Sequence, residues 1–228
     1  MKRSGSDPTA AVVFDVFGTL LDVTASVEPA RAALGADAER LGELWRRKQL
    51  ELSWLRSVMG AYRDFDALTA DALGWAMAAM RVAEPGLAEV LLEGWRHLPA
   101  FADAAATLDA LRAGGLRLAV LSNGTAATLQ TALGSAGLRD RLDLVLSVEP
   151  ARIFKPAAAV YRLATAALEL PAARIVFVSA NSWDAHAAAW NGFRSIRVDR
   201  SGLPEEPLPG CPVHRVGALA ELPPLLLR

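Results

Sequence analysis

The sequence predicts an α/β fold, with a parallel sheet that carries helices on both faces and an all-helical segment inserted after the first strand. Three observations support this prediction. Residues 11–14 form a short apolar run that ends at Asp15, which is typical of a buried parallel strand. Residues 23–98 show helical patterns without period-two alternation. Beyond residue 98, strand and helix patterns alternate, which indicates a parallel sheet.

The composition favours a protein with a sizeable core and a small-molecule partner. The chain has 228 residues, of which 53% are hydrophobic. Its net charge is −1, with both signs interspersed, which argues against a nucleic-acid partner and an anionic membrane surface. No apolar run reaches the ~18 to 20 residues of a membrane span, and no signal peptide is visible. The single Cys211 excludes an internal disulfide, so we expect a reducing, cytoplasmic location.

Composition shifts along the chain divide it into a leader, a core and an insert. Residues 1–10 are small and polar and are expected to form a flexible leader. We expect the core domain to comprise residues 11–22 and 99–228, and the helical cap subdomain to comprise residues 23–98. Because short loops separate the predicted cap helices, a small antiparallel bundle is favoured.

The clearest cap helix is predicted at about residues 38–59, and two others follow at about 68–81 and 87–95. Apolar residues and one lysine recur in the first helix at steps of three and four and predict a single stripe: Leu41, Leu44, Trp45, Lys48, Leu52 and Leu55. A different face is expected to hold Arg46, Gln49, Leu50 and Ser53. Because the stripe is larger than one cap helix needs, we expect a homodimer through the cap.

The second part of the chain supplies the remaining strands and the helices that cover them. The strands are predicted at about residues 116–121, 142–148, 174–179 and, as the last one, 195–198. The helices are predicted at about residues 103–113, 125–136, 156–170 and 183–190. Residues 202–212 are rich in proline and glycine and are expected to be mostly loop.

Polar residues follow each of the first four predicted strands. They are Asp15 and Thr19 after the first, Ser122 and Asn123 after the second, Lys155 after the third, and Ser179, Asn181 and Asp184 after the fourth. The carboxyl ends of parallel strands share one edge of a sheet, so these side chains are expected to converge on a single crevice. An unpaired carboxylate beside an apolar strand is costly, and Asp15 therefore needs partners there.

Several of these residues also have ordinary structural interpretations, which stay open at this point. Ser122 and Asn123 precede a predicted helix, where they can cap it or help to bind an anion. Lys155 can be a solvated surface residue. Beside Asp15, its ammonium would keep that carboxylate ionised, as a nucleophile requires.

Other candidates are equally open from the residues alone. Tyr161 fits either the core or a role in orienting a polar neighbour. Asp184 can cap its helix, anchor Lys155 or position a water molecule. One of Arg46 and Arg47 can reach over the crevice and hold an anion, and the residues do not say which one does.

Taken in this order, the segments resemble the haloacid dehalogenase superfamily, and within it the L-2-haloacid dehalogenases, over roughly residues 11–200. The resemblance lies in DVFGT at 15–19, LSNG at 121–124, FKP at 154–156 and SANSWD at 179–184. The cap segments WRRKQLE at 45–51 and WLR at 54–56 resemble the dehalogenase branch in particular. A Rossmann-like core with a helical cap is what this resemblance implies.

The resemblance also implies a two-step reaction on a small 2-haloacid. Asp15 would attack C2 of an L-2-haloalkanoate, expel halide and form a covalent ester. Water would then attack the carbonyl carbon of Asp15 and release a D-2-hydroxy acid with inversion at C2. The same resemblance assigns assistance of the departing halide to Arg46 and not to Arg47.

Further roles follow from the resemblance alone. Residues that would support Asp15 or the hydrolytic water are Thr19, Lys155, Tyr161, Ser179, Asn181 and Asp184. Residues that would bind the substrate are Phe17, Leu50, Phe65, Ser122, Asn123 and Trp183. The chain departs from the common pattern at Phe17, where a tyrosine is frequent, and at Arg47, where a glutamine is usual. Both departures concern the size and polarity of the pocket.

The main alternative is a small-molecule phosphatase of the same superfamily. Phosphatases place a second aspartate two residues after the nucleophile, and this chain has Phe17, which can neither donate a proton nor bind a metal. Ser179 and Asn181 leave Asp184 as the only carboxylate of the fourth segment, whereas a hard dication prefers more negative oxygen ligands. We therefore expect no metal and no other cofactor.

Two further alternatives are not enzymes. A phospho-accepting signalling module also places an aspartate after a strand and a Lys-Pro pair later, but such modules are about half this length and lack a helical insert. A binding protein without activity is possible, but little supports this alternative, because every polar residue that the mechanism needs is present.

Overall fold

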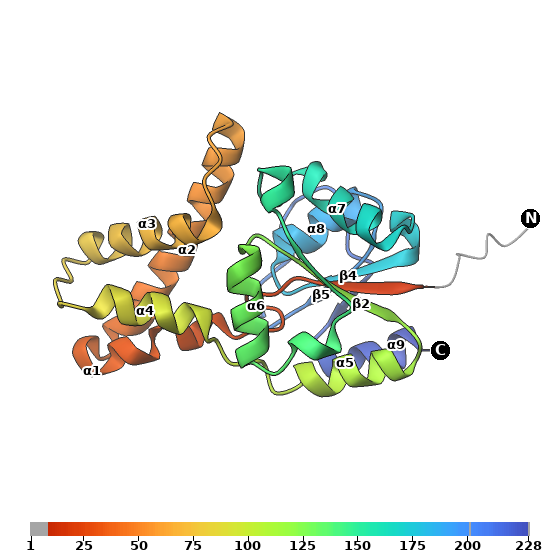
Figure 1. The fold of residues 1–228 in the computed structure, drawn as a ribbon, viewed down its shortest axis with the longest axis horizontal. Helices are drawn as coiled ribbons and strands as arrows, with labels where there is room; N and C mark the ends of the chain where they lie inside the picture. The colour runs from red at the N-terminus through yellow and green to blue at the C-terminus, as the bar shows by residue number, and fades with distance from the viewer. Residues whose placement is uncertain (1–8, 201, 228) are drawn as a thin grey trace, which may run out of the picture.

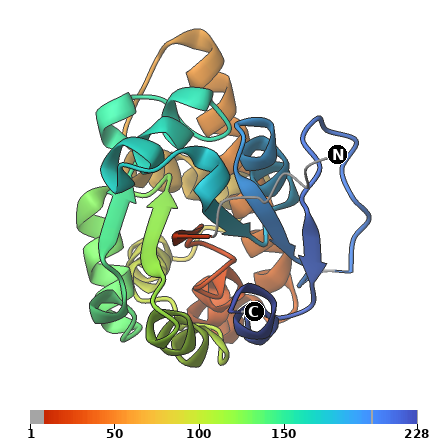
Figure 2. The ribbon, with the colours of Figure 1, turned by 90° about the vertical axis from the view of Figure 1, so that its right-hand side faces the viewer.

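The computed structural model describes residues 9–200 and 202–227, and within these ranges six strands form one parallel sheet. The strands are β1 (Ala11–Phe14), β2 (Arg117–Ser122), β3 (Leu144–Ser147), β4 (Ile175–Ser179), β5 (Arg194–Val198) and β6 (His214–Val216). Their order is β3-β2-β1-β4-β5-β6. Figure 2 shows β1, in red, in the middle of the sheet between the green and the blue strands.

The position of β1 explains its composition. All four of its residues are fully buried, and β2 and β4 pair with it on either side. Valine and phenylalanine suit a strand that is covered on both faces. The backbone N–H of Asp15 donates to the carbonyl of Val178 at 2.9 Å, which extends this pairing by one residue. Asp15 is thereby fixed at the carboxyl edge of the sheet.

Helices cover both faces of the sheet. In the core they are α5 (Ala104–Ala113), α6 (Ala126–Ser135), α7 (Ala158–Leu168), α8 (Ser182–Trp190) and α9 (Leu222–Leu226). Short 3₁₀ helices are η2 (Arg139–Arg141), η3 (Glu149–Ala151), η4 (Ala172–Arg174) and η5 (Leu219–Glu221). Figure 1 shows α5 and α9 below the sheet and α7 and α8 above it. The predicted α/β fold class is confirmed.

The segment after β1 is helical and lies beyond the carboxyl end of that strand (Figure 1). It consists of η1 (Val23–Ala30), α1 (Arg31–Leu34), α2 (Asp37–Met59), α3 (Phe65–Ala79) and α4 (Leu87–Arg96). The two connections to the core run side by side, since the N–H of Asp22 donates to the carbonyl of Pro99 at 2.9 Å. This pairing is consistent with domain boundaries near residues 22 and 99, which stay a prediction.

The predicted apolar stripe of α2 is only partly right. Leu41 and Trp45 are buried as predicted, whereas Leu55 is 50% exposed. Gln49 and Ser53, which were predicted to face elsewhere, are fully buried. Their burial is tolerated because both are hydrogen-bonded, Gln49 to side chains and Ser53 to a carbonyl of its own helix. Helical spacing of apolar residues alone could not reveal a buried face that is half polar.

Two predicted helices begin elsewhere. Helix α3 begins at Phe65 and not at residue 68, because the carboxylate of Asp64 accepts a hydrogen bond from the N–H of Ala67 and caps the helix. Helix α7 spans Ala158–Leu168 and not residues 156–170, because a turn precedes it. In this turn, the N–H of Ala157 donates to the carbonyl of Phe154.

Differences at the two ends of the chain are small. The strand predicted as the last one is followed by β6, which has three residues, two of them exposed, and is too short to show a periodicity. Residues 1–8 of the predicted leader lie outside the described residues. Ala10 pairs with the sheet, since its N–H donates to the carbonyl of Arg174 at 2.9 Å.

Candidate active site

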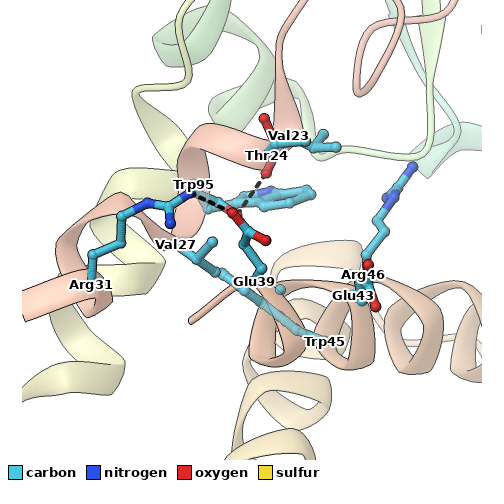
Figure 3. Close-up of a pocket in the computed structure, with 11 residues that line it drawn as sticks. Val23, Thr24, Val27, Arg31, Glu39, Glu43, Trp45, Arg46 and Trp95 are labelled. Atoms are coloured by element: carbon cyan, nitrogen blue, oxygen red, sulfur yellow. Dashed lines mark hydrogen bonds and ion pairs between the residues drawn. The ribbon is translucent and has the colours of Figure 1, made fainter. Parts of the chain in front are cut away.

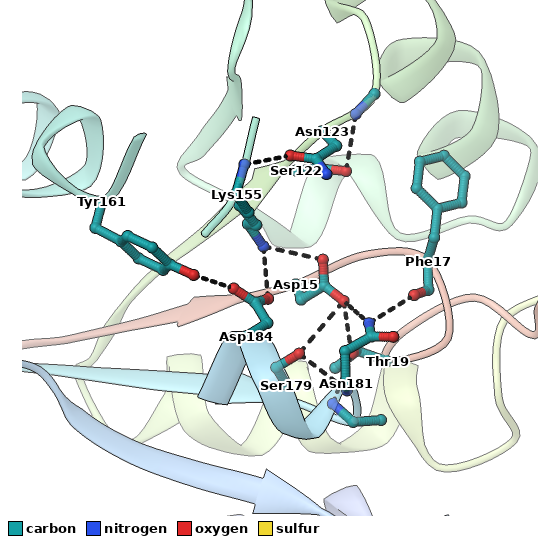
Figure 4. A network of polar contacts seen from close by, with 12 residues as sticks. Asp15, Phe17, Thr19, Ser122, Asn123, Lys155, Tyr161, Ser179, Asn181 and Asp184 are labelled. Carbon is teal, nitrogen blue, oxygen red and sulfur yellow. Dashed lines mark hydrogen bonds and ion pairs between the residues drawn. The ribbon is translucent and has the colours of Figure 1, made fainter. Parts of the chain in front are cut away.

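Polar side chains from four strand ends meet at the carboxyl edge of the sheet (Figure 4). Asp15 follows β1, Ser122 ends β2 and is followed by Asn123, Lys155 lies after β3, and Ser179 ends β4 ahead of Asn181 and Asp184. These are the residues for which the sequence predicts a common crevice. Since β1 is central in the sheet, Asp15 lies in the middle of this group.

The two carboxylate oxygens of Asp15 have different surroundings. Oδ2 accepts hydrogen bonds from Asn181 Nδ2 at 2.7 Å, Thr19 Oγ1 at 3.0 Å and, at a longer 3.5 Å, Ser179 Oγ. Within the part of the chain that the structure describes, Oδ1 accepts one hydrogen bond, from Lys155 Nζ at 3.1 Å. Each carboxylate oxygen can accept about two hydrogen bonds, so Oδ1 keeps a free lone pair.

The turn after β1 brings Thr19 back to Asp15. Gly18 has a φ of +88°, a conformation that residues with a side chain rarely adopt, and its N–H donates to the carbonyl of Leu21 at 2.8 Å. Thr19 Oγ1 also accepts a hydrogen bond from the N–H of Ala180 at 2.9 Å. The turn is therefore attached to the loop that carries Asn181.

Lys155 lies buried between two carboxylates. Its Nζ donates to Asp15 Oδ1 at 3.1 Å and to Asp184 Oδ2 at 2.7 Å, and the residue is 1% exposed. Burial by itself lowers the pKa of Lys155, but the charges of Asp15 and Asp184 outweigh this effect and the pKa is raised. Lys155 is thus a cation at neutral pH, and it is not a solvated surface residue.

Asp184 lies behind Lys155 and is completely buried. Its Oδ1 accepts a hydrogen bond of 2.6 Å from the hydroxyl of Tyr161. Burial raises the pKa of Asp184, and Lys155 opposes this shift. Burial and the charge of Asp184 raise the pKa of Tyr161 well above its usual value, so the phenol stays a donor. Because Asp184 does not line the cavity at Asp15, it is better placed to anchor Lys155 than to contact a water molecule there.

A cavity opens in front of Asp15. It is lined by Asp15, Phe17, Arg46, Leu50, Phe65, Ser122, Asn123, Lys155, Asn181 and Trp183. This set contains all six residues predicted to bind the substrate, whereas Thr19, Tyr161, Ser179 and Asp184 do not line the cavity. Its volume is about 10 Å³, which is roughly room for one water molecule. Binding even a three-carbon acid therefore requires a shift of the cap or of lining side chains.

The structure distinguishes the positions of Arg46 and Arg47. Arg46 lines the cavity together with Asp15, and Arg47 is exposed. Burial lowers the pKa of Arg46 to about 10, while the charge of Asp15 acts in the opposite direction. Arg46 therefore remains a cation at neutral pH. Since Arg47 does not line the cavity, its departure from the common pattern does not alter the lining.

A second cavity of about 500 Å³ lies on the other side of Arg46, between η1, α2 and α4 (Figure 3). Trp45, Trp95 and Arg46 line it together with the charged residues Arg31, Glu39 and Glu43. The ring of Trp95 stacks on Phe17 with 5.0 Å between centroids, so this aromatic pair separates the two cavities. Arg46 lines both cavities.

The cap is attached to the core next to the site. Asp66 Oδ2 on α3 accepts hydrogen bonds from Thr125 Oγ1 at 2.9 Å and Thr128 Oγ1 at 2.8 Å, at the start of α6. Phe65 packs against Phe154 with 5.7 Å between ring centroids. The sequence reasoning missed Asp66 because an acidic residue in the first turn of a helix is common without any partner.

Comparison with known proteins shows the family of this chain. A family model described as haloacid dehalogenase-like hydrolase matches residues 9–192. The chain belongs to this family. It is 41% identical over 223 residues to (S)-2-haloacid dehalogenase 1 from Pseudomonas sp. (strain CBS-3), with 97% of this chain and 98% of the relative covered.

Solved structures of haloacid dehalogenase-like hydrolases superpose closely on this chain. One, a dehalogenase with an intermediate complex, has a TM-score of 0.94 at 39% identity and covers 97% of this chain and 99% of its own. Another is L-2-haloacid dehalogenase from Xanthobacter autotrophicus with chloropropionic acid covalently bound. Its TM-score is 0.89 at 34% identity, and 95% of this chain and 98% of that chain are covered.

The residues at this site do not fit the metal site expected of a phosphatase in this superfamily. Lys155 Nζ lies between the carboxylates of Asp15 and Asp184 and already supplies a positive charge to both. The side chain of Phe17 offers no oxygen, and Asn181 turns its Nδ2 to Asp15. Among the described residues, no group of three His, Cys, Asp or Glu side chains is arranged to hold a metal ion.

Proposed function

We propose that this protein hydrolyses small L-2-haloalkanoic acids to D-2-hydroxy acids and halide through an ester on Asp15. The observation that carries the proposal is the arrangement of the Asp15 carboxylate at the wall of a cavity. Among the described residues, Oδ1 bonds to Lys155 alone, whereas Oδ2 is surrounded by three donors. The (S)-2-haloacid dehalogenases among its relatives support the reaction class. The covalently bound chloropropionic acid in the Xanthobacter autotrophicus enzyme supports a covalent step.

In the first step, Asp15 Oδ1 attacks C2 of the haloacid. The bond between Oδ1 and C2 forms as the bond between C2 and the halogen breaks, and the electron pair leaves with the halide. Lys155 places a positive charge beside the Asp15 carboxylate, and the positive charge of Arg46 stabilises the departing anion. The apolar walls exclude water and leave the attacking carboxylate poorly hydrated. In-line attack inverts the configuration at C2.

In the second step, water attacks the carbonyl carbon of Asp15. Oδ2 is then the ester carbonyl oxygen, and the donors Thr19, Asn181 and Ser179 stabilise the negative charge that develops on it. The bond between this carbon and Oδ1 breaks, so Oδ1 leaves as the hydroxyl oxygen of the product. One water proton ends on that hydroxyl and the other is released. The configuration at C2 does not change in this step.

Ser122 and Asn123 are suited to hold the carboxylate of the substrate. Asn123 Oδ1 accepts a hydrogen bond from the N–H of Lys155 at 3.0 Å, which leaves the Asn123 amide N–H groups free to donate. Ser122 Oγ accepts a hydrogen bond from the N–H of Gly124 at 3.2 Å, and its hydroxyl hydrogen is likewise available. Both residues lie just ahead of α6, whose N-terminus favours an anion.

The proposal predicts release of halide from L-2-chloropropionate and not from the D enantiomer, with D-lactate as product. The rate is expected to be unchanged by an excess of chelator, because no step uses a metal. Halide release and the chirality of the lactate are the measurements. No release from either enantiomer, or phosphate-ester hydrolysis that requires added Mg²⁺, would overturn the proposal in favour of the phosphatase.

A homodimer through the cap belongs to the same proposal. The apolar stripe supports the dimer less than the sequence predicts, because Trp45 is buried within the cap. A cluster of exposed apolar residues lies at the end of α2, where Leu55, Val58 and Met59 are 50%, 89% and 74% exposed. A second copy of the chain would cover this cluster. We expect a dimeric mass at micromolar concentration and a monomeric mass for the double variant Val58→Glu, Met59→Glu. A monomeric wild-type protein would contradict the dimer.

The location of the protein is also a proposal. No helix in residues 9–200 and 202–227 combines the length and the apolar character that crossing a membrane requires. The cytoplasmic location expected from the single Cys211 is proposed on that cysteine alone.

A further inference from the structure

Gln49 is a fully buried amide in the middle of α2, one turn after Arg46. Its Oε1 accepts a hydrogen bond from Arg46 Nη1 at 2.6 Å, and its Nε2 donates to Thr69 Oγ1 at 2.6 Å. A buried amide without partners would be costly, and here both of its ends are used. Gln49 connects a cation at the cavity to the neighbouring helix α3.

The hydrogen bonds have a fixed direction. The single hydroxyl hydrogen of Thr69 is used in a bond of 2.7 Å to the carbonyl of Phe65. Thr69 Oγ1 must therefore accept from Gln49, which places the amide N–H groups of Gln49 toward α3 and its carbonyl oxygen toward Arg46. Trp45 Nε1 donates to the carbonyl of Thr69 at 2.9 Å and fixes α3 against α2. The carbonyl oxygen of Gln49, which faces Arg46, is therefore held in place by α3.

Arg46 makes no other hydrogen bond and no ion pair among the residues that the structure describes. Its remaining N–H groups are free to face an anion in the cavity at Asp15. Since the only acceptor is a neutral amide, the positive charge of Arg46 is not cancelled. A carboxylate in place of Gln49 would pair with the guanidinium and compete with the anion.

We propose that Gln49 is a positioning residue, which holds the Arg46 guanidinium toward the departing halide and keeps its charge available. This inference rests on the proposed function. Without Gln49, the long side chain of Arg46 can move into the adjacent 500 Å³ cavity. When Arg46 is no longer held in place, the departure of halide is expected to slow more than the binding of the acid is weakened.

The test compares three variants with the wild-type enzyme in single-turnover halide release from L-2-chloropropionate and L-2-bromopropionate. Gln49→Met removes the acceptor at similar size, and Gln49→Glu keeps an acceptor but adds a negative charge. Ser53→Ala is the matched control, since Ser53 is also buried and polar on α2, but its hydroxyl donates to the carbonyl of Leu50 in its own helix and not to a residue of α3. Circular dichroism checks that each variant is folded.

For Gln49→Met, we expect release of chloride to slow by about 10- to 100-fold, the effect of one hydrogen bond to a charged group. Release of bromide, the better leaving group, is expected to slow less, so the ratio of the two rates changes while KM changes little. A purely structural role would slow both releases by the same factor. Gln49→Glu is expected to be slow as well, because the introduced carboxylate pairs with Arg46 and competes with the departing halide. Ser53→Ala is expected to match the wild type.

Failure of the role of Gln49 and failure of the proposed function give different results in this test. If the wild type releases halide and Gln49→Met leaves the ratio of chloride to bromide rates unchanged, the role of Gln49 is overturned and the proposed function stands. If Gln49→Met does not fold, Gln49→Glu decides, and wild-type rates in that variant at every pH would overturn the inference. No halide release by the wild type would overturn the proposed function and this inference with it.

Discussion

Replacing Asp15 with asparagine is expected to abolish halide release while the protein stays folded. The amide is a poor nucleophile, but it has the shape of the carboxylate and its oxygen can still accept hydrogen bonds from Thr19 or Lys155. Loss of a nucleophile lowers kcat by at least about four orders of magnitude in enzymes of this kind of chemistry. Halide release and the thermal unfolding curve are the two measurements.

The matched control for this variant is Asp22→Asn. Asp22 lies in the same segment and caps η1 through a hydrogen bond from the N–H of Thr24, a role that asparagine also fills. This control is expected to keep wild-type activity. Activity of Asp15→Asn within tenfold of the wild type would contradict the account, because another group would then have to be the nucleophile.

Lys155→Met is expected to lose nearly all activity and also to lower the free energy of unfolding by about 3 kcal/mol or more. Lys155 separates two buried carboxylates, and without it Asp15 and Asp184 face each other with no cation between them. Their buried negative charges would be uncompensated, and Asp15 would lose the cation that holds its attacking oxygen. Halide release and chemical unfolding measure the two effects.

The stability effect has a defined pH dependence. The pKa of Lys155 is raised from its ordinary value of 10.5, so its stabilisation is complete below that pH and is lost as the pH rises through the raised value. The difference in unfolding free energy between wild type and Lys155→Met is therefore largest near neutral pH and shrinks above about pH 10.5. Lys48→Met is the control, because Lys48 forms a more exposed ion pair with Glu51, for which a small effect is expected. Rates near the wild type in Lys155→Met would contradict the role of this lysine.

Much of the site could be predicted because it lies on the sheet. Each strand is short and apolar, and the residue type at its end is visible in the sequence, as for Asp15 and Ser179. The parallel order then brings these ends together. The hydrogen-bond partners within the crevice were harder to predict. Only the structure shows that Asp184 bonds to Tyr161 and Lys155 and does not line the cavity.

The cap was harder to predict. Arg46 and Arg47 differ by about 100° around α2, so choosing between them requires the rotation of this helix relative to the core. That rotation depends on α3, and Gln49 is buried because Thr69 offers it a partner 20 positions away. The aromatic contact between Trp95 and Phe17 joins α4 to the turn after β1 in the same way. No local pattern reports such contacts.

The most direct test of the central claim is a single turnover of L-2-chloropropionate in water labelled with ¹⁸O, with excess enzyme, followed by mass spectrometry of the peptide that contains Asp15 and of the lactate. The account predicts one ¹⁸O atom in the carboxylate of Asp15 and none in the hydroxyl of the lactate, because water attacks the ester carbonyl carbon. Label in the lactate hydroxyl with none in Asp15 would mean that water attacks C2 directly, and would contradict the ester on Asp15.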